Sequence, residues 1–274
     1  MTRGLFVAVD GPGGVGKSTV TGLVAQQLQD QGVRVLATRE PIDAPLGDLA
    51  RHSTEEYRGE AMACLMAAGR YQHGEEICAA LESGEVVVCD RYIASSLALQ
   101  RMDGVDPDFV WLLNERVTMP HLTVLITAQP DVIAKRLADR GTHSRYERMD
   151  GSSHIECAYF HDAGRFIRDK GLRVLDVDAT QASPEEVART IVATITRLRK
   201  DYQPHGAERA DVQPQQPVPG ACGATAPVPG GPPGAGPRAH GGGAQRRMRP
   251  LGQALPGVRT PRDVPPAPSA ASAA

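Results

Sequence analysis

The chain has 274 residues, a net charge of −2 at pH 7 and 41% hydrophobic residues, which gives no reason to expect nucleic acid or a membrane surface as its partner. Its five cysteines are odd in number and show no Cys-x-x-Cys spacing, so we expect a reducing compartment and inert thiols. The sequence enters a strand-like segment directly and has no apolar run of transmembrane length. We therefore expect a cytoplasmic protein.

The first predicted element is a short apolar strand, Leu5–Val9, followed by the glycine-rich segment DGPGGVGKST. Between Gly11 and Ser18 this segment completes the pattern Gly-x-x-x-x-Gly-Lys-Ser, in which backbone N–H groups and a helix N-terminus surround phosphate groups. Lys17 can reach the β- and γ-phosphates, and the Ser18 hydroxyl is placed to ligate Mg²⁺. The expected ATP-binding residues of this phosphate loop are Gly11, Pro12, Gly13, Gly14, Val15, Gly16, Lys17, Ser18 and Thr19.

Further apolar segments alternate with helical patterns up to about residue 203. The first helix carries an apolar stripe that includes Val20, Val24 and Leu28, and the last begins at a capping pair, Ser183 and Glu186. This alternation predicts an α/β fold with a parallel five-stranded sheet and helices on both faces. The predicted strands are Leu5–Val9, Val33–Ala37, Glu85–Cys89, Leu122–Thr127 and Leu172–Val177.

The composition changes after the last predicted helix. Residues 204–274 are rich in Pro, Gly, Ala and Arg and have hardly any aliphatic cluster, so they cannot bury enough apolar surface to fold. We therefore expect one folded domain at residues 1–203 and a disordered tail at residues 204–274. The tail is interpreted as a solvated appendage, with a basic arm for an acidic partner and an extended reading frame as alternatives.

Charged residues follow the predicted strands at the edge where a parallel sheet binds its ligands. Asp90 ends a buried strand beside the phosphate loop, where a carboxylate can hold Mg²⁺ or its waters. Arg91 comes next and offers a fork of donors that matches a second phosphate. A kinase must hold a phosphorylated acceptor in line with ATP, whereas a switch ATPase has no need of such a site.

At these residues the sequence resembles the thymidylate kinase family in its bacterial form, over about residues 4–200. The motifs that carry the resemblance occur in order: the phosphate loop, TREP, LMAAGRYQH, CDRYIASSLALQ and YFHDAGRF. The resemblance implies a P-loop nucleoside monophosphate kinase fold, ATP and Mg²⁺ as phosphate donor and metal, and a homodimer. It also implies phosphorylation of a pyrimidine nucleoside monophosphate, either dTMP or a related or modified pyrimidine nucleotide.

By resemblance, Arg91 and Arg51 grip the acceptor phosphate, and Glu40 of TREP lies close by. The same resemblance assigns the thymine edge to residues that carry hydrogen-bonding groups. An ordinary solvated helix arginine is the alternative for Arg51, whereas Arg91 has little reason to lie at a strand end except ligand binding. The residues assigned to the thymine edge are Arg70, Ser96 and Gln100.

An arginine-bearing segment, about residues 140–157, resembles the mobile lid of the family. Phosphoryl transfer needs positive charge against the equatorial oxygens, and a closing lid can deliver it while excluding water. Because the phosphate loop has Gly14 in place of an arginine, we expect this charge from Arg140, Arg145 or Arg148. The alternative is a merely solvated basic loop.

Three residues depart from the family pattern. Gly13 stands where the family usually has an acidic residue, Met66 where it has a phenylalanine against the base, and Leu99 where it has a tyrosine against the sugar. Met covers a ring face more adaptably than an aromatic side chain, and loss of the tyrosine removes a wall against a 2′-hydroxyl. These changes predict weaker preference for dTMP, as in a kinase for a modified pyrimidine nucleotide or in a slow thymidylate kinase.

Three other functions share part of this pattern. A partition-type ATPase shares the string GGVGKST but has a lysine where this chain has Pro12. A nucleoside kinase, whose acceptor lacks a phosphate, leaves Arg51 and Arg91 without an anion. A catalytically idle descendant that acts through interactions alone is compatible with Gly13 and is excluded by turnover of any nucleotide.

Overall fold

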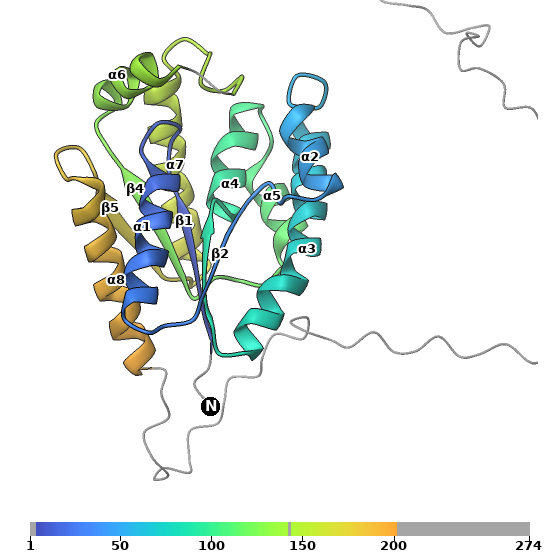
Figure 1. Cartoon of the computed structure of the whole chain (residues 1–274). Coiled ribbons are helices and arrows are strands. Elements are labelled where there is room, and N and C mark those ends of the chain that lie inside the picture. The colour runs from blue at the N-terminus through green and yellow to red at the C-terminus, as the bar shows by residue number, and fades with distance from the viewer. Residues whose placement is uncertain (1–3, 142–143, 202–274) are drawn as a thin grey trace, which may run out of the picture. The chain divides into compact units, whose positions relative to one another are not determined.

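The computed structural model describes residues 4–141 and 144–201, which form a parallel five-stranded sheet between two layers of helices (Figure 1). The strand order is β2-β3-β1-β4-β5, so β1 lies in the centre, with β3 and β2 on one side and β4 and β5 on the other. The carboxyl ends of all strands therefore meet at one edge, where ligands bind. The strands are β1 (Leu5–Asp10), β2 (Val35–Arg39), β3 (Val86–Asp90), β4 (Leu122–Thr127) and β5 (Val174–Asp178).

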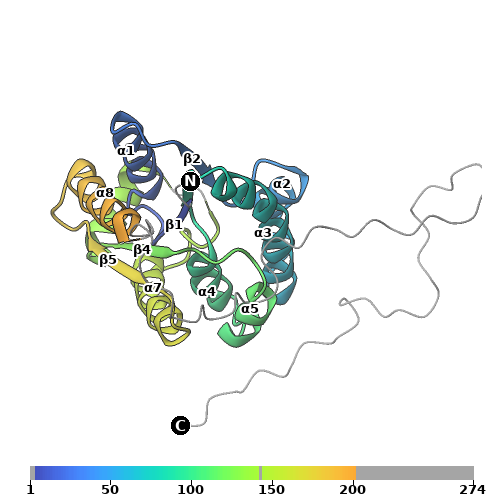
Figure 2. The ribbon, with the colours of Figure 1, turned by 90° about the horizontal axis from the view of Figure 1, so that it is seen from below.

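The helices divide between the two faces of the sheet. Seen from below, α1 and α8 cover one face, and α3, α4 and α7 cover the other (Figure 2). The predicted α/β fold with helices on both faces is thus confirmed. The helices are α1 (Lys17–Asp30), α2 (Pro45–His52), α3 (Gly59–Glu82), α4 (Ile93–Met102), α5 (Pro107–Asn114), α6 (Pro130–Arg140), α7 (Ser152–Asp169) and α8 (Pro184–Asp201).

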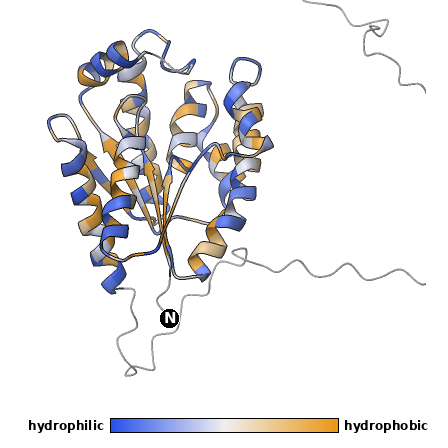
Figure 3. Cartoon of the chain, in the orientation of Figure 1, coloured by the Kyte–Doolittle hydropathy of each residue, from blue (hydrophilic) through white to orange (hydrophobic). Residues whose placement is uncertain are grey.

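Strand β1 shows how one short sequence supports two cores. Successive side chains of a strand point to opposite faces, so Val7 and Val9 join the core under α1 and α8, while Phe6 and Ala8 join the core under α3, α4 and α7. Both faces are covered, which explains why the inner strands β1 and β3 are continuously apolar up to their last residue and do not alternate (Figure 3).

Two predicted strands begin two residues too early. The N–H of Val33 donates to the carbonyl of Leu28, and the N–H of Leu172 donates to that of Ile167. Both residues therefore close the end of the preceding helix before the chain enters the sheet. At the start of α8 the predicted capping pair is confirmed, because Ser183 Oγ accepts from the N–H of Glu186 at 3.2 Å and Glu186 Oε2 accepts from the N–H of Ser183 at 2.8 Å.

The predicted lid, residues 140–157, consists of two kinds of structure. Helix α6 ends at Arg140, turns cover residues 144–151, and α7 begins at Ser152, so the last third of the predicted lid is the first part of a long helix. The tail, residues 204–274, lies outside the described residues, so the domain boundary near residue 203 stays a prediction. Among the described helices, none combines the length and apolar character needed to cross a bilayer.

Candidate active site

The phosphate loop follows β1 directly and turns over the carboxyl edge of the sheet. Its first residue, Gly11, has φ +152° and approaches β4 so closely that a Cβ would lie 2.3 Å from the carbonyl oxygen of Ile126. Only glycine fits at this position. The loop ends at Gly16, and α1 begins at Lys17, so its helix N-terminus points into the loop as an anion site requires.

Lys17 is already held inside this loop. Its Nζ donates to the carbonyl of Pro12 at 2.7 Å, and only 5% of the residue is exposed. Burial, and then the nearby Arg91 charge, lower the pKa of Lys17 to about 7, although Asp90, Glu156 and Asp10 oppose the shift. The lysine therefore lacks a full counter-charge in the loop, and the phosphates of a nucleotide can supply it.

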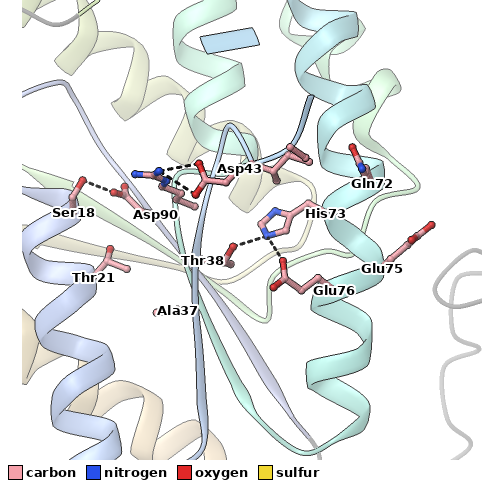
Figure 4. Close-up of a pocket in the computed structure, with 13 residues that line it drawn as sticks. Ser18, Thr21, Ala37, Thr38, Asp43, Gln72, His73, Glu75, Glu76 and Asp90 are labelled. Carbon is pink, nitrogen blue, oxygen red and sulfur yellow. Dashed lines mark hydrogen bonds and ion pairs between the residues drawn. The ribbon is translucent and has the colours of Figure 1, made fainter. Parts of the chain in front are cut away.

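Ser18 and Asp90 form an oxygen-rich cluster beside Lys17. The Ser18 hydroxyl donates to Asp90 Oδ2 at 2.5 Å, at one end of an open groove of about 710 Å³ (Figure 4). Among the described residues, neither Asp90 Oδ1 nor Asp10 Oδ2 has a hydrogen-bond partner, although both atoms are buried. Hard oxygen donors with unused capacity fit Mg²⁺, so the residues present are compatible with the predicted metal.

Arg91 occupies an unusual backbone conformation at the end of β3. Its φ of 72° is left-handed, a region in which non-glycine residues are uncommon. The surroundings fix this conformation, because the N–H of Arg91 donates to the carbonyl of Val9 at 2.9 Å and the N–H of Tyr92 donates to Asp10 Oδ1 at 3.0 Å. Strain of this kind concentrates at functional sites, where it aims a side chain.

A second cavity, of about 210 Å³, lies between Arg91 and helix α4, and we call it the acceptor pocket. It is lined by residues from the phosphate loop, the segment after β2, α2, α3, α4, the lid and α7, which lie far apart in the sequence. The structure thus brings together every residue predicted to contact the acceptor except Arg70. These lining residues are Glu40, Arg51, Met66, Arg91, Ser96, Leu99 and Gln100.

Arg70 lies behind the wall of the acceptor pocket. Its guanidinium is fully buried and donates to Glu40 at 2.6 and 2.9 Å, to Asn114 at 2.6 Å and to Ser96 at 3.1 Å. It also lies over the ring of Tyr92. In this conformation Arg70 positions two lining residues, Glu40 and Ser96. It does not line the pocket itself, so the direct contact with a base that the sequence predicts is not seen here.

Two polar residues of the pocket, Gln100 and Arg51, differ in how many of their hydrogen-bonding groups already have partners in the protein. Gln100 Oε1 is buried and, among the described residues, has no hydrogen-bond partner. It can therefore accept a hydrogen bond from an N–H at the edge of a base. Arg51 is partly committed, since it donates to the carbonyl of Pro41 at 2.7 Å and to Asp48 at 2.9 Å, and its side chain is 33% exposed.

Each of the three predicted lid arginines is bound to a carboxylate. Arg140 contacts both oxygens of Glu147 at 3.0 Å, Arg145 grips Asp103 with both terminal nitrogens, and Arg148 pairs with Glu55. Only the Arg145–Asp103 pair is well buried on both sides, with side chains 10% and 8% exposed. The lid cations therefore need new partners before they can act on a phosphate.

Sequence reasoning missed four residues that shape this site. Asp10 accepts from the backbone and hydroxyl of Ser95, and Glu156 Oε2 accepts from the N–H of Gly13 at 2.7 Å. Arg136 donates to the carbonyl of Ala179 at 3.0 Å and also contacts the carbonyl of Val15 in the phosphate loop. Asp103 holds the lid through Arg145. The place of Asp10 at a strand end was a usable signal, whereas the other three show no local pattern.

A parallel sheet with a phosphate loop at its central strand, and a separate pocket with arginines at one end, define a P-loop kinase that holds donor and acceptor side by side. The family model described as thymidylate kinase matches residues 9–191. The chain belongs to the thymidylate kinase family.

Relatives extend this match over nearly their full lengths. The chain is 37% identical over 205 residues to the thymidylate kinase of Thermomicrobium roseum, covering 71% of this chain and 96% of that protein. It is 34% identical over 213 residues to the thymidylate kinase of Geotalea uraniireducens, with 71% and 98% covered. A probable thymidylate kinase of Archaeoglobus fulgidus is 29% identical over 199 residues, with 72% and 99% covered. The chain is accordingly a nucleoside monophosphate kinase, and the partition-type ATPase is set aside.

Proposed function

We propose that the chain transfers the γ-phosphate of ATP to a pyrimidine nucleoside monophosphate, either dTMP or a related or modified pyrimidine nucleotide. The observation that carries this proposal is the acceptor pocket, which joins a phosphate-binding arginine, Arg91, to the unpartnered amide oxygen of Gln100. One end suits an anion, and the other suits the N–H edge of a base. A nucleoside kinase has no use for the anion-binding end.

On the donor side, the phosphate loop binds the polyphosphate through its backbone and through Lys17. Ser18 and Asp90 would hold Mg²⁺, which bridges the phosphates of the nucleotide and neutralises charge. Lys17 lies within the same cluster and gains its counter-charge when phosphates bind. These residues act mainly by positioning and charge, as phosphoryl transfer requires.

For the lid, we keep Arg140, Arg145 and Arg148 as candidates for charge stabilisation. Arg140 is the best placed of the three, because its partner Glu147 lies against Gly13 of the phosphate loop. Both partner carboxylates are buried, but the Arg140 side chain is 42% exposed and can move to a phosphate, whereas the Arg145 side chain is itself buried. We therefore rank Arg140 first.

The experiment that tests the proposal measures ADP release by the full chain with dTMP, dUMP, UMP, dCMP, a 5-modified pyrimidine monophosphate, dGMP and unphosphorylated thymidine. We expect turnover with pyrimidine monophosphates and little with dGMP or thymidine. Turnover with thymidine alone would show a nucleoside kinase, and no turnover with any acceptor would show a catalytically idle protein.

The acceptor preference itself is tested at two of the apolar lining residues, Met66 and Leu99. Changing Leu99→Tyr together with Met66→Phe restores a wall and a ring face, and one such contact changes discrimination by about ten- to two-hundred-fold. We expect kcat/KM for dTMP to rise relative to UMP. If the parent already discriminates as sharply as the double variant, these positions do not set specificity.

We also propose a homodimer. The large apolar side chains of Leu49, Tyr71 and Leu112 are exposed on α2, α3 and α5, at 42%, 43% and 60%. Exposed apolar groups of this size favour a covered surface. Light scattering after size exclusion, on the parent and on Leu112→Glu, tests the assembly, and a monomeric parent contradicts it. The cytoplasmic location expected from the sequence stays a prediction.

A further inference from the structure

Tyr146 is a lid residue that lines the acceptor pocket and is joined to helix α4. It is 5% exposed, and its hydroxyl donates to Asp103 Oδ2 at 3.0 Å. Arg145, which grips the same carboxylate, donates to the Tyr146 hydroxyl oxygen at 2.8 Å. Asp103 caps the end of α4, so this part of the lid is fastened to the helix that carries Ser96 and Gln100.

The Tyr146 hydroxyl has one proton, and Asp103 accepts it. Burial, and then the Asp103 charge, raise the pKa of Tyr146, while Arg145 and a hydrogen bond with the Gln100 side chain oppose the shift. The hydroxyl therefore keeps its proton at neutral pH. Because an ionised carboxylate can only accept a hydrogen bond, the proton points to Asp103, and toward its other partners the Tyr146 oxygen is an acceptor.

This assignment fixes the direction of the Gln100 side-chain amide. A group that meets an acceptor oxygen must donate to it, so the amide nitrogen of Gln100 faces Tyr146. The amide oxygen, Oε1, is then directed elsewhere; it is buried and, within the part of the chain that the structure describes, has no hydrogen-bond partner. Both residues line the acceptor pocket, so a base bound there meets an acceptor at Gln100.

Ser96 has the opposite polarity one turn earlier on α4. Its Oγ accepts from Arg70 at 3.1 Å, and because a guanidinium can only donate, the Ser96 proton stays available for a ligand. Positions four apart lie on one face of a helix, so Ser96 and Gln100 present a donor beside an acceptor. A uracil-type base, with a carbonyl next to a ring N–H, complements this pair, whereas cytosine has an amino group and a bare ring nitrogen there.

We propose that Tyr146 is a positioning residue for base recognition, which holds the Gln100 amide with its oxygen toward the base. This proposal rests on the function proposed above and adds a lid residue that acts through Gln100. Asp103 and Arg145 complete the arrangement, since they take the Tyr146 proton and occupy one of its lone pairs. A displaced lid leaves the amide free to turn, so discrimination between bases requires the lid in place.

The first experiment measures kcat/KM for dTMP and dCMP in the parent and in Tyr146→Phe. The substitution keeps the ring and removes only the hydroxyl, so the Gln100 amide can turn its nitrogen toward the base. We expect the dTMP-to-dCMP ratio to fall about five- to tenfold, the worth of one hydrogen bond, with the KM for ATP unchanged. The matched control is Tyr159→Phe, which removes a hydroxyl from α7 outside the pocket and should leave the ratio unchanged.

The second experiment asks whether Tyr146 acts through Gln100. Gln100→Leu keeps an apolar side chain of similar bulk and removes the amide, so it should itself lower the ratio. In this background Tyr146→Phe should have no further effect, because no amide is left to orient. Gln100→Met is made in parallel so that the comparison does not depend on one packing arrangement, and melting curves report whether each variant keeps the fold.

The positioning role is wrong if the parent does not prefer dTMP to dCMP, or if Tyr146→Phe leaves the ratio unchanged. It is also wrong if Tyr146→Phe lowers the ratio equally with and without the Gln100 amide. Calorimetric binding of the same two nucleotides separates this failure from failure of the proposed function. A parent without turnover refutes the kinase, while the effect of Tyr146→Phe on its preference in binding still tests the positioning role.

Discussion

The phosphate loop and the lid both carry cations that we propose act on the phosphates, but the protein holds these cations in opposite ways. Lys17 is held by a backbone carbonyl and is short of negative charge, so burial lowers its pKa to about 7. The lid arginines, by contrast, each bind a carboxylate of the protein itself. A bound nucleotide offsets the cost of burying the Lys17 charge, whereas it must compete with a protein carboxylate for an arginine of the lid. The loop cation is thus in place before a ligand binds, whereas a lid arginine has to exchange its carboxylate for the ligand.

The largest effect should come from removing the prepared cation. Lys17→Ala strips charge from the β- and γ-phosphates and should lower kcat by roughly 10²–10³-fold for every acceptor. The measurement is steady-state ADP release under saturating ATP. Lys135→Ala, on the exposed side of α6, is the control for loss of a lysine. A Lys17→Ala enzyme within tenfold of the parent would mean that the lid alone carries the phosphate charge.

A smaller, one-sided effect is expected at Arg91, which belongs to the fixed part of the site. If Arg91 binds the acceptor phosphate as proposed, Arg91→Ala removes that charged contact and should lower kcat/KM for the acceptor about 10- to 100-fold. ATP binding, measured by calorimetry, should stay close to that of the parent. Equal losses for ATP and acceptor would place Arg91 in the donor site.

The lid is tested by its buried pair. Asp103→Asn leaves the Arg145 cation without its charged partner, which should lower the free energy of unfolding by about 2 kcal/mol. Glu55→Gln removes the exposed partner of Arg148 and should cost less than about 0.5 kcal/mol. Denaturant titration of both variants makes the comparison. Equal losses would show that burial does not distinguish the two lid contacts.

The smallest expected effect is the uptake of a proton by Lys17 when ATP binds. Free Lys17, with a pKa of about 7, is mostly neutral at about pH 8, and bound phosphates favour its charged form. ATP binding at this pH should take up close to one proton, measured by calorimetry in buffers of different ionisation enthalpy. Lys17→Arg stays charged and should take up less. The lowered pKa also means that the unfolded chain binds more protons between pH 7 and the ordinary value of 10.5, so the nucleotide-free fold gains stability as the pH rises.

The sequence predicts the sheet and the phosphate loop well because both are local. Strand spacing and the Gly11–Ser18 pattern lie within a few residues. The closing turns at Val33 and Leu172 delay two strands by two residues, and the other strand limits shift by at most two residues. The lid shows where this reasoning ends. Arg145 looks like a free cation in the sequence, yet its partner Asp103 lies 42 positions away.

The acceptor pocket is predicted from the sequence less well than the phosphate loop and better than the lid. Family motifs identify most of its lining, but the burial of Arg70 depends on Glu40, Asn114 and Ser96, which come from three separate elements. The contact of Glu156 with Gly13 joins residues 143 positions apart. Pairings of this kind follow from packing and have no signature in a single sequence.

Asp10 has a consequence for how such an enzyme can change over time. One of its oxygens holds the N–H groups of Tyr92 and Ser95 and the Ser95 hydroxyl, so the start of α4 is fastened to the central strand just before the phosphate loop. Leu99 lies one turn further along that helix, beyond the fastening. Substitutions there can alter which nucleotide is accepted while the geometry of phosphate transfer stays fixed, which lets the chain acquire new acceptors without losing its chemistry.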